Sequence, residues 1–256
     1  CSSDLGRVRG VDHADGVAVG CRLGDEVGAD HVATITLNRP EVLNAFDRRM
    51  CEEMADAWAQ VKRDPTVHAV VLRAAGDRAF CAGLDTAKPY GQPDDIWNHE
   101  DPGELLSPKW QKVWKPVVCA VQGICTAGAF YFVNESDIII CSEDATFFDP
   151  HVSIGLVSGR EVVRLARVLP LNVAMRAALM GRQERISAER AFQLGMVSEV
   201  IPHDQLLPAE LDVIWPRSMC RSLLSLPNRQ TCRYARKIAS SRSRRTNAHK
   251  YSPASA

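Results

Sequence analysis

Two short apolar segments each run into a turn made of small residues, at positions 79–85 and 115–129. Small side chains let backbone N–H groups come close to a ligand. If the two turns lie side by side, two N–H donors can point at one oxygen atom and form an oxyanion hole. The pattern therefore predicts a site for a reaction in which a carbonyl oxygen gathers negative charge. The alternative is two tight turns whose glycines serve packing alone.

Three further sequence blocks accompany these turns along the chain. In order, the full set comprises residues 35–46, 79–85, 115–129, 147–155 and 187–197. This set resembles the crotonase superfamily (enoyl-CoA hydratase/isomerase), and the resemblance covers roughly residues 31–205. One block alone is a weak signal, whereas five blocks in order strongly predict the fold. The particular reaction depends on the site itself.

The resemblance implies which residues form the site. The oxyanion hole is expected from the backbone N–H groups of Leu84 and Gly128, and a helix starting near Gly128 adds partial positive charge. The resemblance implies no metal. It also implies no separate cofactor, because CoA is part of the substrate. The resemblance also implies a set of substrate-binding residues, namely Val42, Asn44, Ala82, Gly83 and Asp85. Of these, Asp85 is also expected to anchor its turn.

The resemblance also identifies a departure from typical hydratases, which hold one water molecule between two glutamates. The two corresponding positions carry Tyr131 and His151, so this chain is expected to lack both glutamates. A histidine titrates near working pH and can pass a proton either way, whereas a tyrosine is a weak base but a useful hydrogen-bond donor. We therefore expect His151 to be the proton shuttle, with Tyr131 assisting. Core packing with a bonded hydroxyl is the alternative for Tyr131.

Asp149 and Glu161 are the nearest spare carboxylates to these two positions. Either one is a candidate to orient His151 or to replace the missing base, and solvation or helix capping is the alternative for both. A single base with an oxyanion hole suffices for removing a proton alpha to a thioester, hence for isomerisation. With bound water, the same groups serve hydration.

Two other functions stay open at this point. One is cleavage of a C–C bond, or hydrolysis, of a cyclic or branched acyl-CoA. The other is a catalytically weak protein whose basic C-terminal tail binds nucleic acid, because ten basic and no acidic residues follow Asp212. We consider nucleic-acid binding the less favoured, since runs of charge are usually solvated. No glycine-rich phosphate loop is present, which argues against NAD and ATP.

The composition is typical of a globular protein with one sizeable core, since 46% of the 256 residues are apolar. No apolar run approaches the length of about 20 residues that crosses a bilayer, and no secretory signal is visible. The nine cysteines are scattered without a Cys-x-x-Cys pair, which indicates reduced thiols. A cytoplasmic protein without membrane contact is expected, and the resemblance implies a homotrimer or hexamer.

The elements that must position the site are predicted from hydrophobic patterns. Apolar runs predict strands at residues 32–37, 69–72, 117–121 and 138–141, and helical spacing predicts an amphipathic helix over residues 47–62. Ser187 is the expected N-cap of a helix that ends at Gly195. The fold class is α/β. The resemblance implies a crotonase-like ββα spiral, with two roughly perpendicular sheets wrapped by helices.

The chain divides into three expected regions. Residues 1–30 are a weakly ordered N-terminal segment, residues 31–205 form the crotonase core, and residues 206–256 form a helical or basic tail. Within the core, residues 86–108 are rich in Pro, Asp and Gly and predict a mobile loop or short helix beside the acyl pocket.

Overall fold

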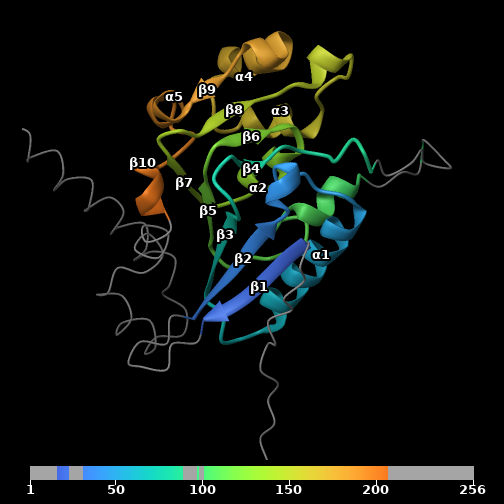
Figure 1. Cartoon of the computed structure of the whole chain (residues 1–256), viewed down its shortest axis with the longest axis vertical. Helices are drawn as coiled ribbons and strands as arrows, with labels where there is room; N and C mark the ends of the chain where they lie inside the picture. The colour runs from blue at the N-terminus through green and yellow to red at the C-terminus, as the bar shows by residue number, and fades with distance from the viewer. Residues whose placement is uncertain (1–15, 23–30, 89–96, 98–100, 207–256) are drawn as a thin grey trace, which may run out of the picture. The chain divides into compact units, whose positions relative to one another are not determined.

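The computed structural model describes residues 16–22, 31–88, 97 and 101–206 (Figure 1). These residues lie in a unit that runs from Cys1 to Ile214. The predicted tail, 206–256, falls outside the described residues except for Leu206, and so do most of the segment 1–30 and part of the loop 86–108.

The larger sheet has a buried, mostly parallel arrangement. Its strands follow one another in the order β1 (Gly16–Arg22), β2 (Val32–Asn38), β3 (Ala69–Ala74), β5 (Val117–Val121), β7 (Ile138–Ser142) and β10 (Glu199–Ile201). All neighbours are parallel except β1 and β2. The central strands are continuous apolar runs because elements cover both faces of a parallel sheet. The four strands predicted from these runs are confirmed.

A second, smaller sheet lies beside the first. It contains β4 (Ala79–Cys81), β6 (Ile124–Thr126), β8 (Thr146–Phe148) and β9 (Ile186–Ser187), in that order. The chain alternates between the sheets: β3 leads into β4, β5 into β6, and β7 into β8. Each pair of strands therefore adds one turn of a spiral, and both sheets grow in chain order.

The helices cover the sheets and connect successive turns (Figure 1). The α-helices are α1 (Arg48–Arg63), α2 (Phe130–Val133), α3 (Arg160–Leu165), α4 (Leu171–Met180) and α5 (Ala188–Gln193). Short 3-10 helices are η1 (Pro40–Val42), η2 (Pro102–Leu106), η3 (Ala127–Ala129), η4 (His151–Ile154), η5 (Gly181–Gln183) and η6 (His203–Gln205). The described part is thus an α/β fold with two sheets and surrounding helices, as predicted.

The predicted amphipathic helix is confirmed as α1. The Asp47 side chain accepts a hydrogen bond from the Met50 amide and caps its first turn. Its apolar stripe enters the core, where the Trp58 indole donates to the Leu106 carbonyl at 3.0 Å. This contact fixes η2, inside the predicted loop 86–108, against the main core. Ser187 is confirmed as the N-cap of α5, where it accepts from the Arg190 amide.

No helix in the described ranges is long and apolar enough to cross a membrane.

Candidate active site

The first turn of the site follows β4. The Phe46 amide donates to the Gly83 carbonyl at 2.8 Å, and the Asp85 amide donates to the Phe46 carbonyl at 2.9 Å. These two bonds form a parallel bridge between Phe46 and Leu84. In such a bridge, the N–H of the central residue points away from the partner strand. The Leu84 amide therefore faces the opposite side of the turn.

The second turn is the start of η3, after β6. Gly128 is the second residue of that 3-10 helix, where an amide has no carbonyl acceptor in its own helix. Ala127 before it has a φ of +52°, a left-handed conformation that reorients the backbone at this corner.

The two turns contact each other directly. A Cβ atom added to Gly83 would lie 2.7 Å from the Ala127 Cβ and 3.2 Å from the Gly128 nitrogen. A Cβ atom added to Gly128 would lie 2.5 Å from carbons of the Phe46 ring. Both glycines are thus required by close packing, and Gly83 also has a φ of +89°. The structure places the corners that carry the Leu84 and Gly128 amides side by side.

Asn44 holds the segment before α1 onto the connection between β3 and β4. Its side-chain amide donates to the carbonyls of Ala75 and Ala79, both at 2.9 Å, and its oxygen accepts from the Arg39 amide at 2.8 Å. The residue is buried and has a φ of +53°. Of the residues predicted to bind substrate, Asn44 therefore has its polar atoms engaged within the protein.

Asp85 has a buried basic partner. Its carboxylate accepts from the Arg39 guanidinium at 3.0 Å and from the Ala87 amide at 3.1 Å. Burial works against ionisation, but these bonds hold the pKa of Asp85 below its ordinary value. Arg39 also lies 3.4 Å from Asp47. Arg39 lies within the motif block 35–46, but the sequence pattern does not single it out, because its partners Asp47 and Asp85 follow it at intervals that match no local motif.

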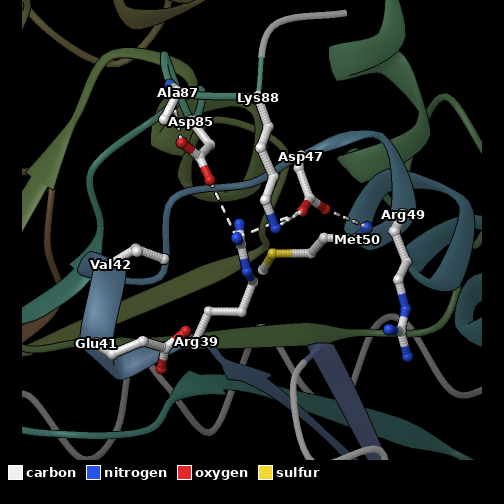
Figure 2. Close-up of a pocket in the computed structure, with 9 residues that line it drawn as sticks. All are labelled: Arg39, Glu41, Val42, Asp47, Arg49, Met50, Asp85, Ala87 and Lys88. Carbon is white, nitrogen blue, oxygen red and sulfur yellow. Dashed lines mark hydrogen bonds and ion pairs between the residues drawn. The ribbon is translucent and has the colours of Figure 1, made fainter.

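A pocket opens beside this ion-pair network. It has a volume of about 430 Å³, and Figure 2 shows Arg39 between the carboxylates of Asp85 and Asp47. Lys88 reaches over the pocket, 3.7 Å from Asp47. The half-exposed Val42 completes one wall. The pocket is lined by Arg39, Glu41, Val42, Asp47, Arg49, Met50, Asp85, Ala87 and Lys88.

His151 and its carboxylate neighbours form a second cluster of titratable side chains. The His151 Nδ1 atom is hydrogen-bonded to Asp149, which also accepts from the His151 amide. The Asp149 hydrogen bond raises the pKa of His151, although burial opposes the shift. The Nε2 atom lies 3.9 Å from a carboxylate oxygen of Glu161. Burial raises the pKa of Glu161.

Tyr131 lies between the glycine turn and these carboxylates. A Cβ atom on Gly128 would be 3.7 Å from its ring. Its hydroxyl donates to Asp101, a residue that sequence reasoning did not single out. Burial and this bond raise the pKa of Tyr131 well above its ordinary value. Tyr131 is therefore a neutral hydrogen-bond donor. The negative charge of Glu161 also helps to raise the pKa of Tyr131.

Comparison with known proteins identifies the family. The sequence model of the enoyl-CoA hydratase/isomerase family matches residues 28–226. The chain belongs to this family, and hence to the crotonase superfamily. Among curated relatives of this family, the (E)-benzylidenesuccinyl-CoA hydratase of Thauera aromatica is 34% identical over 175 residues, covering 68% of this chain and 67% of the relative. The 1,2-epoxyphenylacetyl-CoA isomerase of Escherichia coli is 35% identical over 181 residues, covering 68% of both chains.

Solved crotonase structures share the fold. An enoyl-CoA hydratase/isomerase from Mycobacterium paratuberculosis is 39% identical with a TM-score of 0.65, covering 88% of this chain and 90% of that chain. The crotonase fold expected from the motif blocks is thus confirmed. No group of three or more His, Cys, Asp or Glu side chains in the described ranges is arranged to hold a metal ion.

Proposed function

We propose that this crotonase acts on acyl-CoA thioesters and stabilises a thioester enolate in an oxyanion hole formed by the Leu84 and Gly128 amides. The direct contact between the two turns carries this proposal. Neither amide is used by the regular hydrogen bonding of its own turn. An enolate oxygen held there gains about 3 kcal/mol from one such donor.

The proton chemistry is assigned to His151. Its hydrogen bond to Asp149 fixes the ring and directs Nε2 away from Asp149, as in other histidines that carry protons. Tyr131 assists as a neutral hydrogen-bond donor whose hydroxyl is held by Asp101. One base and one enolate-stabilising pair suffice for isomerisation, and a bound water molecule extends the chemistry to hydration.

The pocket beside Asp85 is the proposed site for the CoA part of the substrate. Arg39 is neutralised by Asp47 and Asp85, whereas Lys88 is largely exposed at the rim. An ammonium group on a flexible stem suits a phosphate group. Val42 supplies an apolar contact, and the Ala82–Leu84 backbone leads from this pocket to the proposed oxyanion hole.

Self-association into a homotrimer or hexamer is part of the proposal, as is a cytoplasmic location. Large apolar side chains are exposed along η4, the residues after it, α3 and α4, and these elements contact one another. Monomeric proteins rarely expose a large contiguous apolar patch. The exposed residues are Val152, Ile154, Leu156, Val157, Val163, Val168, Leu171, Met175, Leu179 and Met180.

Replacing Leu84 by proline tests the oxyanion hole. Proline removes the backbone N–H, so we expect kcat on acyl-CoA substrates to fall by about 100-fold or more. Leu84→Ala is the matched control, because it shortens the half-exposed side chain and keeps the amide. Turnover of a panel of acyl-CoAs, with products identified by mass spectrometry, separates isomerisation and hydration from cleavage or hydrolysis. Equal turnover by both folded variants would contradict the role of this amide.

A further inference from the structure

Both imidazole nitrogens of His151 face carboxylates. Nδ1 is bonded to Asp149, whose side chain is almost fully buried, and Nε2 faces Glu161 across 3.9 Å. Asp149 and His151 precede α3, and Glu161 lies in its first turn. Because Gly155 and Gly159 allow the chain to fold back between them, residues ten apart come to face each other.

The gap between His151 and Glu161 is suited to one bridging oxygen atom. A separation of 3.9 Å is too long for a hydrogen bond between Nε2 and Oε1. A water molecule or hydroxyl group about 2.8 Å from each atom spans this distance. The pair is therefore spaced to hold an oxygen rather than to bond directly.

The basic side chains near Glu161 are paired with other carboxylates, so the Glu161 carboxylate faces His151. The two arginines of α3 are paired elsewhere: Arg160 contacts Glu104 in η2, and Arg164 lies 3.1 Å from Glu135 after α2. Asp101 takes the Tyr131 hydroxyl. Within the described part of the chain, His151 is the cationic group placed within 4 Å of Glu161.

We propose, on the basis of the function proposed above, that Glu161 is a second catalytic acid–base residue, which holds the reacting water or hydroxyl oxygen together with His151. The substrate class is then a 2-enoyl-CoA, or in reverse a 3-hydroxyacyl-CoA. Asp149 is a positioning residue for the imidazole. The burial-raised pKa of Glu161 and the raised pKa of His151 agree with a pair that exchanges one proton.

Water adds across the C=C bond in two steps. The water oxygen forms a bond to the β-carbon and its proton passes to the Glu161 carboxylate, while the C=C electrons move onto the thioester oxygen at the Leu84 and Gly128 amides. The enolate then collapses, and its α-carbon takes the proton from the His151 imidazolium. Glu161 returns its proton to Nε2, which restores the starting state.

Two reactions of one variant test this assignment. In Glu161→Gln, we expect hydration of crotonyl-CoA and cinnamoyl-CoA to fall at least 100-fold, because a carboxamide does not accept the water proton. Exchange of the α-proton of butyryl-CoA in D2O needs the oxyanion hole and His151 alone, and is expected to stay within about tenfold of wild type. His151→Gln is expected to lose both reactions.

Glu184→Gln is the matched control, since it removes another largely buried, ion-paired glutamate charge that takes no part in the His151–Glu161 pair, and it is expected to keep hydration. Thermal unfolding verifies that each variant is folded. If Glu161→Gln does not fold, Glu161→Asp replaces it, with expected partial hydration activity and unchanged exchange. Three results would each overturn the role of Glu161: hydration at the wild-type rate by Glu161→Gln, equal loss of hydration and exchange in Glu161→Gln, or an unmutated protein that exchanges the α-proton but does not hydrate. Absence of binding, exchange and turnover in wild type would instead overturn the proposed function.

Discussion

At the scale of single residues, Gly83 is where the two turns of the site meet. Its φ of +89° and the 2.7 Å approach of the Ala127 Cβ leave no space for a side chain. A methyl group there strains the backbone and displaces the second turn. The positions of both proposed oxyanion donors therefore depend on residue 83 being glycine.

We expect Gly83→Ala to lower the free energy of unfolding by about 1–3 kcal/mol and to reduce acyl-CoA turnover at least tenfold. Gly195→Ala separates the two causes, since Gly195 also has a positive φ but a Cβ there would meet no atom within 4 Å. Thermal unfolding and turnover of both variants make the comparison. Turnover lost to the same extent in both would show that the collision at Gly83 does not matter.

At the scale of elements, His203 joins η6 to two distant turns. Its Nδ1 atom lies 3.0 Å from Asp144, in the turn between β7 and β8, and its Nε2 atom lies 3.6 Å from Asp77, in the turn between β3 and β4. The hydrogen bond to Asp144 raises the pKa of His203 in the folded state. The last described element is thus tied to earlier turns of the spiral by a titrating group.

This link predicts a pH-dependent stability. Because the folded pKa exceeds the unfolded value of about 6.5, the stabilisation is present below that value and is lost as pH rises through the folded pKa. We expect His203→Gln to lower the thermal midpoint more at pH 6 than at pH 8.5. The corresponding loss in the free energy of unfolding is at most about 1 kcal/mol. Added salt is expected to reduce the difference. A midpoint difference that grows with pH would contradict this sign.

At the scale of the whole molecule, the exposed apolar side chains of α3 and α4 make assembly testable. Val163 and Leu179 are both about two-thirds exposed. A charged side chain in a buried contact is costly, so we expect Leu179→Glu to dissociate the assembly into folded monomers. Trp114→Glu, which alters an exposed apolar residue outside these helices, is expected to leave the assembly intact. Sedimentation velocity distinguishes the outcomes, and a monomeric wild type would contradict self-association.

Features that depend on residues close in sequence could be predicted, whereas contacts between residues far apart in sequence could not. The strand runs, the Asp47 and Ser187 helix starts and the glycine turns are local patterns, so they were predictable. The pairing of Arg39 with Asp85 and of Tyr131 with Asp101 joins residues far apart in sequence, and it depends on the path of the backbone. The spacing of His151 from Glu161 depends in the same way on how the segment between them folds back.

The order in which the two sheets grow bears on how the protein is synthesised. A ribosome delivers β3 before β5 and β5 before β7, and each new strand completes the open parallel edge left by its predecessor. Until β10 pairs with β7 and β9 pairs with β8, the edges of the two sheets in an emerging chain are the apolar strands β7 and β8. If translation stalls before these last strands, the intermediate exposes apolar strand edges that favour aggregation. Such an intermediate is expected to bind a chaperone.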